Sequence, residues 1–531
     1  MLSISSTLLN YLSLEGFKMN ALFIYPEIPD TFWSFKHALR YVSKKAAFPP
    51  LGLLTVAAMA PDSWNKRVVD MNVEPLRDED LLWADYAFLS AMLVQKQSVH
   101  HVIKRCKDYG LKIVAGGPYF TSSEEDFPMI DHLVLDEAEV TLPMFLKDLK
   151  KGIPRHVYRS GEKPDLSITP IPQWDLIDIQ AYDSMPVQFS RGCPFDCEFC
   201  DITLLYGRKQ RTKEVQQFIA ELDALYKRGW RGSVFVVDDN FIGIKPKAKA
   251  MLRELIKWMD SHGRPFYFLT EASLNLVDDQ ELMDLMRLAG FNKVFVGIES
   301  PSKESLKEAN KVQNMNKDLL AAVRKLQENG MDVMGGFIIG FDNDPEEIFD
   351  MQIDFIQKSG ITRAMVGLLE VLPGTRLYKR LKAQGRLLAE GTGNNTDGQL
   401  NFIPRMNRQR LVEGYLKVLE TVYSPRGYYE RCITFLKHYR PRVASRTSIP
   451  EIMAFFKSIW YIGIRNEASM RLYYWKLLIK SILINPKTFG KAVSMAIIGV
   501  HFRKSLLGHK PDAYTGYATE DAGATQIAGR P

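Results

Sequence analysis

The first part of the chain alternates short apolar runs with segments long enough to form a helix. Alternation of this kind is typical of a parallel β-sheet with helices on both faces. We therefore predict a Rossmann-like α/β domain over residues 20–151. Its expected strands are Ala21–Tyr25, Arg67–Met71, Tyr86–Ser90, Lys112–Ala115 and His132–Leu135, and the segments between them include helices at Leu51–Ala60, Gln97–Tyr109 and Val140–Lys150.

A second alternating series follows a stretch rich in Pro and Asp, residues 152–186, which we interpret as a linker. The spacing of its apolar runs leaves room for one crossover helix between each pair of strands. Six such units predict a (β/α)6 partial TIM barrel over residues 187–389, with its active site at the carboxyl ends of the strands. The expected strands are Val187–Ser190, Val234–Asp238, Phe266–Thr270, Val294–Glu299, Met334–Ile339 and Ala364–Leu369.

The alternation fades in the last part of the chain, where residues 390–508 indicate a helical domain. Residues 1–19 are expected to be a loose N-terminal extension, and residues 509–531 a disordered tail. Residues 401–510 contain 20 Lys and Arg against 5 Asp and Glu, a balance of +15. Because the whole chain carries +7, the remainder sums to −8. A basic region beside a mildly acidic body points to an anionic partner.

Composition places the chain among ordinary globular proteins, with 46% hydrophobic and 25% charged residues. The sequence has no run of about 18 uninterrupted apolar residues, so we predict no membrane-spanning helix. The N-terminus shows no signal-peptide pattern. Five cysteines are too few for a disulfide scaffold and favour a reducing compartment. We therefore expect a cytoplasmic protein. The absence of a G-x-G-x-x-G fingerprint and of a G-K-[ST] phosphate loop argues against a nicotinamide or nucleoside-triphosphate enzyme.

Three of the five cysteines lie within eight residues, directly after the first expected strand of the barrel. Cys193, Cys197 and Cys200 have the x3 and x2 spacing that lets three thiolates converge on three irons of a 4Fe–4S cluster. The fourth iron would remain open to a small chelating substrate. Structural zinc is the alternative, but it normally needs four ligands, and neither His nor a fourth Cys lies near this loop.

This cysteine spacing resembles the signature of the radical S-adenosylmethionine superfamily, including the aromatic Phe199 just before the third cysteine. The resemblance implies that S-adenosylmethionine chelates the open iron and is cleaved by one electron to a 5′-deoxyadenosyl radical. A flavodoxin- or ferredoxin-like donor would supply that electron. The resemblance also implies a set of S-adenosylmethionine contacts at the strand ends: Phe199, Asp238, Asp239, Asn240, Glu271, Ser273, Glu299, Ser300, Gly336 and Gly340.

One feature of that set departs from the superfamily pattern, and another matches it. Asp238-Asp239-Asn240 stands where the superfamily usually has a Gly-Gly-Glu-like motif that holds the methionine amine. Gly336 and Gly340 bracket a G-x-I-x-G strand, in which glycine lets adenine approach the backbone closely. The alternative for each position alone is an ordinary loop polar residue or a turn glycine.

A parallel five-stranded domain ahead of the barrel resembles the cobalamin-dependent branch of the superfamily. The resemblance implies that Ser90, Gly116, Gly117 and Glu137 contact the cobalamin. The chain lacks the D-x-H-x-x-G motif that supplies a His beneath the cobalt, so we expect no protein His there. The alternative is a degenerate Rossmann-like domain without a ligand.

Three segments together resemble one subgroup of these methylases, which carries a helical C-terminal extension and includes a bacterial hopanoid C-2 methylase. They are TFWSFKHALRYVSKKAAFPPLGLLTVAA, RGCPFDCEFCDI and LLEVLPGTRLY. The resemblance implies methylation of an unactivated carbon through methylcobalamin and a 5′-deoxyadenosyl radical, on a small molecule or a lipid such as a hopanoid.

Two other functions remain open at this stage. One is oxidation, cyclisation or rearrangement by the same cofactors without methyl transfer, and the other is a non-catalytic cluster protein or a tRNA-modifying enzyme. Basic residues in the C-terminal region alternate with long apolar stretches, which suits a lipid interface better than nucleic acid. We therefore expect a peripheral membrane surface there, on the inner face. The alternative is a solvated basic face on helices packed against the barrel.

Overall fold

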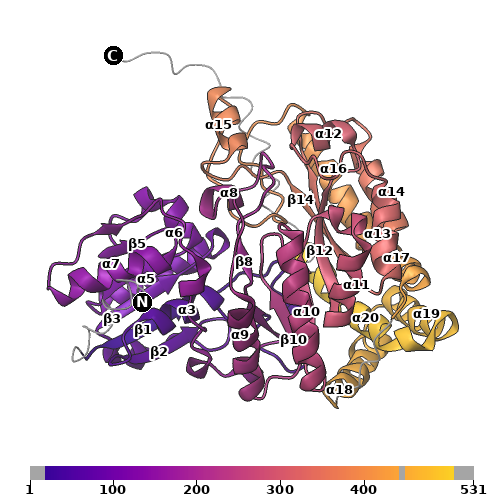
Figure 1. The fold of residues 1–531 in the computed structure, drawn as a ribbon. Coiled ribbons are helices and arrows are strands. Elements are labelled where there is room, and N and C mark those ends of the chain that lie inside the picture. Colours follow the sequence, from indigo (N-terminus) through magenta and orange to yellow (C-terminus); the bar gives the residue numbers. More distant parts are fainter. Residues whose placement is uncertain (1–17, 442–448, 508–531) are drawn as a thin grey trace.

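The computed structural model describes residues 18–441 and 449–507. Figure 1 shows an N-terminal α/β domain (indigo to purple) beside a larger α/β unit, with the C-terminal helices in yellow. The expected tail at 509–531 and nearly all of the expected extension at 1–19 lie outside the described residues.

The N-terminal sheet has six parallel strands in the order β2-β1-β3-β4-β5-β6. Five of them match the strands expected from the sequence. The sixth, β6, lies inside the segment interpreted as a linker, where a two-residue strand has no detectable pattern. The strands are β1 (Asn20–Tyr25), β2 (Asn65–Asp70), β3 (Tyr86–Ser90), β4 (Lys112–Gly116), β5 (His132–Val134) and β6 (Val157–Tyr158).

Helices cover this sheet because their apolar residues recur at helical spacing. In α5 the buried residues Val99, Val102, Ile103 and Cys106 follow the i, i+3, i+4, i+7 pattern of a single buried face. The helices of the domain are α2 (Lys36–Leu39), α3 (Leu51–Met59), α4 (Asp78–Trp83), α5 (Lys96–Asp108), α6 (Pro118–Ser122) and α7 (Ala138–Lys150).

The second sheet also has six parallel strands, in the order β7-β10-β11-β12-β13-β14, as a partial barrel requires. Its strands are β7 (Ser184–Val187), β10 (Ser233–Val236), β11 (Tyr267–Glu271), β12 (Phe291–Glu299), β13 (Asp332–Ile339) and β14 (Arg363–Leu368). The helices around it are α8 (Ile202–Leu205), α9 (Val215–Lys227), α10 (Lys245–Ser261), α11 (Gln280–Ala289), α12 (Lys303–Glu308), α13 (Leu319–Glu328) and α14 (Ile348–Ser359).

The expected strand at Val187–Ser190 is displaced. The sheet uses Ser184–Val187, and the chain then forms a separate antiparallel ribbon of β8 (Ser190–Arg191) with β9 (Arg211–Thr212). The carboxylate of Asp238 accepts hydrogen bonds from the Phe189 amide (2.8 Å) and the Ser190 hydroxyl (2.5 Å). These hydrogen bonds to the loop after β10 direct Phe189 and Ser190 away from the barrel sheet.

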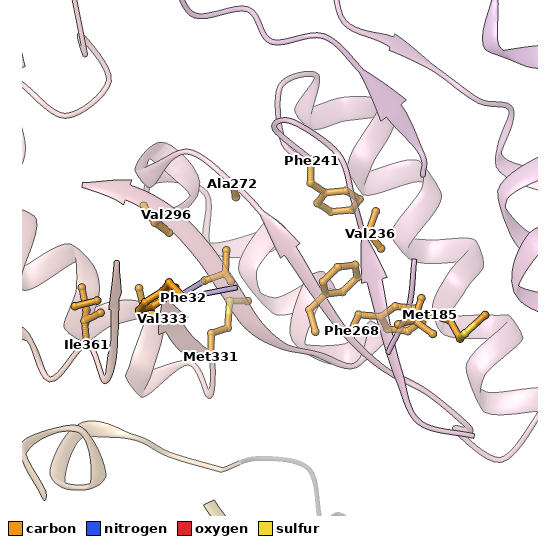
Figure 2. Packing of buried hydrophobic residues seen from close by; sticks show 14 of the residues in the cluster. Phe32, Met185, Val236, Phe241, Phe268, Ala272, Val296, Met331, Val333 and Ile361 are labelled. Atoms are coloured by element: carbon orange, nitrogen blue, oxygen red, sulfur yellow. The ribbon is translucent and has the colours of Figure 1, made fainter. Parts of the chain in front are cut away.

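One face of the barrel sheet packs against the surrounding helices. Val294, Val296 and Ile298 alternate along β12 and are fully buried, as the two-residue period of a strand requires. Figure 2 shows Val296 with Phe268 and Val333 from neighbouring strands in this apolar layer. The other face points into the barrel, where the functional groups lie.

A buried ion cluster closes the amino-terminal end of the barrel. Asp332, at the start of β13, pairs with Arg363 at the start of β14 and with Lys491 of the C-terminal helix α20 (Phe489–Leu507), the latter at 2.8 Å. Burial, together with the charges of Lys491 and Arg363, lowers the pKa of the nearby Lys293 to about 7. Lys491 therefore belongs to the interior, although it counts toward the basic C-terminal region.

The C-terminal region is helical, as expected, and is joined to the barrel by α15 (Arg376–Ala383). It comprises α16 (Arg408–Val422), α17 (Pro425–His438), α18 (Ile449–Ser458), the π-helical segment η7 (Ile459–Ile464), α19 (Ala468–Ile484) and α20. Asn407 and Ser424 cap α16 and α17 with their side chains. Among the described helices, none has both the length and the apolar character needed to cross a bilayer.

Candidate functional site

The cysteine loop lies between β8 and α8, at the carboxyl-terminal end of the barrel. Gly192 immediately precedes it with a φ of +92°, and a Cβ there would lie 2.8 Å from the carbonyl oxygen of Gly207. The Cys193 amide donates to that same carbonyl at 3.3 Å. The loop therefore depends on a close backbone contact that only glycine permits.

Nitrogen donors face two of the three sulfurs. The Asn240 side-chain amide is 3.8 Å from Cys193 Sγ, and the Gln313 amide is 3.9 Å from Cys197 Sγ. Burial raises the pKa of all three thiols in the loop, including that of Cys200. Burial therefore disfavours the thiolate forms of these cysteines. The positive charge of a bound metal cluster would offset that cost.

A buried lysine beside the loop escaped the sequence analysis. Lys311 Nζ contacts Glu299 Oε1 at 2.6 Å, and both side chains are about nine-tenths buried. Burial alone would lower the pKa of Lys311, but the negative charges of Glu299 and of Cys197 and Cys200 raise it overall. The site thus contains a fixed cation next to sulfurs that become negative as thiolates. In the sequence, Lys311 is a lysine in a polar loop, and such a residue cannot be distinguished from an ordinary solvent-exposed lysine.

The two aspartates that follow β10 have different roles. Asp238 is fully buried and bonds to the Phe189 amide and the Ser190 hydroxyl, so it positions the approach to the cysteine loop. Asp239 accepts from the Gly192 amide at 2.8 Å. Burial, and then the charge of Asp238, raise the pKa of Asp239 to about 7.

Asn240, Ser273 and Glu271 meet at the ends of β10 and β11, as the sequence predicted. Asn240 Nδ2 lies 3.2 Å from the Ser273 hydroxyl, and the Ser273 amide donates to Asn240 Oδ1 at 3.2 Å. Burial, followed by the charges of Asp239 and Asp238, raises the pKa of Glu271 to about 8. A cavity of about 400 Å³ opens beside Asn240 and Ser273 and is also lined by Pro194 and Phe195.

Other expected residues are near the site but have engagements of their own. Phe199 stands 6.3 Å from Phe341, centroid to centroid, and Ser300 is fully buried with its hydroxyl accepting from the Ser302 amide. A Cβ on Gly336 would lie 2.9 Å from Phe295, so the ring of that side chain covers this glycine.

Gly340 has the character of a turn glycine. It has a φ of +113°, and its amide donates to Asp344 Oδ2 at 2.7 Å. A Cβ there would face Leu369 and Leu411. Gly340 therefore forms a turn after β13, and its expected contact with adenine stays a prediction.

Three of the four residues expected to contact cobalamin gather at the carboxyl edge of the N-terminal sheet. Gly117 has a φ of +93°, and a Cβ there would lie 2.7 Å from the Ser90 hydroxyl. A Cβ on Gly116 would lie 2.4 Å from the carbonyl oxygen of Val134. The strand ends therefore form a narrow, backbone-lined edge.

The carboxylate of Glu137, the fourth expected residue, is engaged in ion pairs. Its carboxylate pairs with Arg191 and Arg211, each at 2.8 Å, and Arg191 also pairs with Glu139 at 2.7 Å. These partners are far away in the sequence, so the pattern around Glu137 gave no sign of them. Glu137 joins the N-terminal domain to the β8–β9 ribbon, and its expected corrin contact stays a prediction.

A loop of the N-terminal domain reaches the inner face of the barrel. The indole Nε1 of Trp33, in the segment after β1, lies 3.0 Å from Met365 Sδ, and its ring lies 5.4 Å from that of Phe295. Phe295 and Met365 are also the side chains that face Gly336. Trp33 therefore adds an aromatic wall to the barrel interior.

Comparison with known proteins gives two family matches. The model of the radical SAM superfamily matches residues 187–356, and that of a domain of unknown function, DUF4070, matches residues 375–507. An uncharacterized methyltransferase of Synechocystis sp. is 42% identical over 91% of each chain. The hopanoid C-2 methylase of Rhodopseudomonas palustris is 33% identical over 87% of this chain and 89% of its own.

Solved structures give the same fold. The cobalamin-dependent S-adenosylmethionine radical enzyme OxsB, with aqua-cobalamin and S-adenosylmethionine bound, matches 95% of this chain and 82% of its own, with a TM-score of 0.60 and 16% identity. The radical S-adenosylmethionine methyltransferase TsrM from Kitasatospora setae, with cobalamin and a 4Fe–4S cluster bound, matches 90% of this chain with a TM-score of 0.58 and 14% identity.

Proposed function

Because the chain belongs to the cobalamin-dependent radical S-adenosylmethionine methylase family, we propose that it methylates an unactivated ring carbon of a membrane lipid, as a hopanoid C-2 methylase. The observation that carries this proposal is the 33% identity to a hopanoid C-2 methylase along nearly the whole of both chains. A second observation supports a lipid: the C-terminal helices expose a large apolar face beside basic residues.

The residues of the cysteine loop suit a 4Fe–4S cluster. Cys193, Cys197 and Cys200 would hold three irons, while Lys311 and the amide of Asn240 would offset the negative charge on the sulfurs. Such a cluster supplies the electron that cleaves S-adenosylmethionine, and cobalamin supplies the methyl group. We propose that cobalamin binds at Ser90, Gly116 and Gly117, because ligands of parallel α/β sheets lie beyond the carboxyl ends of the strands.

The carboxyl groups at the strand ends would pair with the positive charge of S-adenosylmethionine. With pKa values raised to about 7 and 8, Asp239 and Glu271 are partly or mainly protonated at neutral pH. A cationic ligand would favour their charged forms, since opposite charge nearby lowers the pKa of an acid. We propose that Asp239, Glu271, Asn240 and Ser273 bind S-adenosylmethionine and that Asp238 positions the loop.

The test of this function uses deuterated methyl groups. The reconstituted enzyme, given methyl-deuterated S-adenosylmethionine, a flavodoxin-type reductant and a hopanoid in vesicles, should place the labelled methyl on the lipid and release 5′-deoxyadenosine. Mass spectrometry measures both products. Release of 5′-deoxyadenosine with an altered but unmethylated lipid would instead establish oxidation, cyclisation or rearrangement. A hopanoid left unchanged while another lipid is methylated would refute the hopanoid assignment.

The proposed lipid-facing surface is formed by α18, η7 and α19, at the lower right of Figure 1. Phe456, Leu472 and Leu483 are more than 60% exposed there, which is unusual for such large apolar side chains. The exposed side chains of this surface are Ile449, Ile452, Met453, Phe456, Trp460, Tyr461, Ile464, Leu472, Trp475, Ile479, Ile482 and Leu483. Arg465, Arg471, Lys476 and Lys480 lie among them in sequence.

We expect the intact protein to sediment with anionic liposomes at low salt and to release in part at high salt. Each basic residue near an anionic leaflet contributes roughly 1 kcal/mol, and the apolar side chains insert into the headgroup boundary. Replacing Phe456, Leu472 and Leu483 together with Ser should shift most of the protein to the supernatant. Leu82→Ser, at a 74% exposed position on α4, is the matched control and should sediment like the wild type.

Protein that stays in the supernatant at low salt would contradict the lipid-facing role. If the same protein is a dimer in solution and the triple Ser variant is a monomer, the surface is instead an interface between two copies of the chain.

A further inference from the structure

Two histidines and an aspartate meet where the N-terminal domain contacts the last helix. Asp30 belongs to the loop after β1, His37 belongs to the short helix α2 that follows it, and His501 belongs to α20, at the other end of the chain. His37 Nε2 lies 2.6 Å from Asp30 Oδ2, and one ligand atom from each of the three residues lies within 4.8 Å of the others. This cluster is far from the cysteine loop in sequence and shares no residue with the site described above.

The hydrogen bonds around the cluster leave His501 with a lone pair that faces it. His501 Nε2 lies 3.0 Å from the Phe32 carbonyl oxygen, which can only accept, so Nε2 carries the ring proton and Nδ1 offers a lone pair. The Ser505 hydroxyl lies 3.1 Å from His501 Nδ1 and 2.7 Å from Asp30 Oδ1. Because that hydroxyl has one proton, it satisfies only one of these two acceptors.

The Ser34 hydroxyl is a second donor near Asp30. Its hydroxyl lies 2.8 Å from the Thr31 carbonyl oxygen and 3.2 Å from Asp30 Oδ1, so its single proton is also shared between two acceptors. Protonating His501 a second time would place a charge on a fully buried ring. One possible ligand atom from each of Asp30, His37 and His501 lies within 4.8 Å of the others, an arrangement that can bind a metal cation.

We propose that Asp30, His37 and His501 bind a Zn²⁺ ion, with the Ser505 hydroxyl or a water molecule as the fourth ligand. Two imidazoles and a carboxylate form a known type of zinc donor set. The bond from His501 Nε2 to the Phe32 carbonyl fixes the tautomer that leaves Nδ1 free to bind, as the outer partner of a metal-ligating histidine commonly does.

Zinc binding would change some distances in the cluster, and ligand atoms now up to 4.8 Å apart would move closer together. Zinc bonds of about 2.0–2.1 Å in a tetrahedron place neighbouring ligand atoms roughly 3.3 Å apart. The Asp30–His37 contact at 2.6 Å would therefore lengthen, while the Ser505–His501 contact at 3.1 Å would barely change. Aromatic rings lie beside His501, whose ring centroid is 5.4 Å from that of Phe35 and 5.5 Å from that of Phe502, so water has limited access to this histidine.

The ion would hold a loop that reaches the barrel. Trp33 lies between Asp30 and His37 in the sequence and contacts Met365 and Phe295 inside the barrel. A bond from this loop to α20 would restrict the movement of the indole. The zinc ion would therefore have a structural role, because it would link the segment after β1 to α20. This proposal does not depend on the proposed substrate.

The test is the zinc content of the full-length protein with its iron–sulfur cluster reconstituted, after exposure to ZnCl₂ and dialysis. We expect one zinc per chain, and X-ray absorption at the zinc edge should show nitrogen and oxygen neighbours without sulfur. The same measurement on the chain with Cys193, Cys197 and Cys200 all changed to Ala excludes zinc held by the cysteine loop.

His37→Ala and Asp30→Asn should each weaken zinc binding by more than about 100-fold, beyond the 10–100-fold typical of outer-shell partners. His101→Ala, at an exposed position of α5, is the matched control and should bind zinc like the wild type. Circular dichroism checks that each variant is folded. A wild type that retains no zinc, a zinc ion with sulfur neighbours in the reconstituted chain, or unchanged binding by folded His37→Ala would each overturn the proposal.

Discussion

Changing Cys197 to Ala is expected to eliminate retention of a complete 4Fe–4S cluster and, with it, formation of 5′-deoxyadenosine. The reason is the number of ligands: three thiolates hold three irons, and two cannot fix the remaining edge of the cluster. Cys197 is the most buried of the three, and Lys311 and Gln313 both act on its sulfur. Iron is measured by chelation after anaerobic reconstitution, and 5′-deoxyadenosine by liquid chromatography.

Cys106→Ala provides the matched control, because Cys106 is a buried thiol on α5 in the other domain. It should retain about four irons per chain, as the wild type does. Turnover by the Cys197→Ala protein equal to that of the wild type would refute the assignment of the cluster to this loop.

The second large effect is expected from Lys311→Met. This change leaves Glu299 buried without its cation, and breaking a buried pair from one side costs about 3–5 kcal/mol. The free energy of unfolding, measured by urea under anaerobic conditions on the protein without its cluster, should fall by that amount. Iron retention should fall as well, since the positive charge beside Cys197 and Cys200 is gone.

Two further variants separate the pair from a general loss of charge. Lys311→Met combined with Glu299→Gln should recover much of the stability, because no uncompensated charge remains. Lys317→Met breaks an ion pair with Asp278, whose side chain is 53% exposed, and should cost less than about 1 kcal/mol. If Lys311→Met costs as little as Lys317→Met, the buried pair does not have the role given to it here.

The fold could be predicted to a large extent because its signals are local. Both parallel sheets follow from apolar runs separated by helix-length segments, and ten of their twelve strands overlap the expected ranges by three or more residues. The exceptions have non-local causes. The two-residue β6 exists only through its pairing with β5, and β7 ends early because Asp238 captures the following residues from another strand end.

The candidate site divides in the same way. The proximity of Asn240 to Cys193 and Ser273 could be predicted, because these residues follow neighbouring strands of one sheet. Lys311 and the partners of Glu137 could not, since their significance comes from burial beside residues that are distant in the sequence. A lysine within a polar loop and a glutamate before a helix have no pattern that indicates such partners.

The charge count of the C-terminal region needs the structure for its interpretation. The balance of +15 suggests a basic surface, but Lys491 is paired with Asp332 inside the barrel, and Arg431 is only 1% exposed. Those two charges are therefore unavailable to an anionic partner. The lipid-facing surface relies on fewer cations than the sequence suggests, and its apolar side chains have a correspondingly larger part in binding.

The position of Lys491 also bears on the order in which the protein can fold as it is synthesised. Asp332 and Arg363 leave the ribosome well before α20, so for that interval the carboxylate at the end of the barrel has only one of its two cations. A nascent chain can form the N-terminal domain early, because its six strands are complete by residue 158. The barrel end is finished only when the last described helix arrives. Chains that terminate before α20 should consequently be recognised as incomplete by chaperones and proteases, even though every strand of both sheets is present.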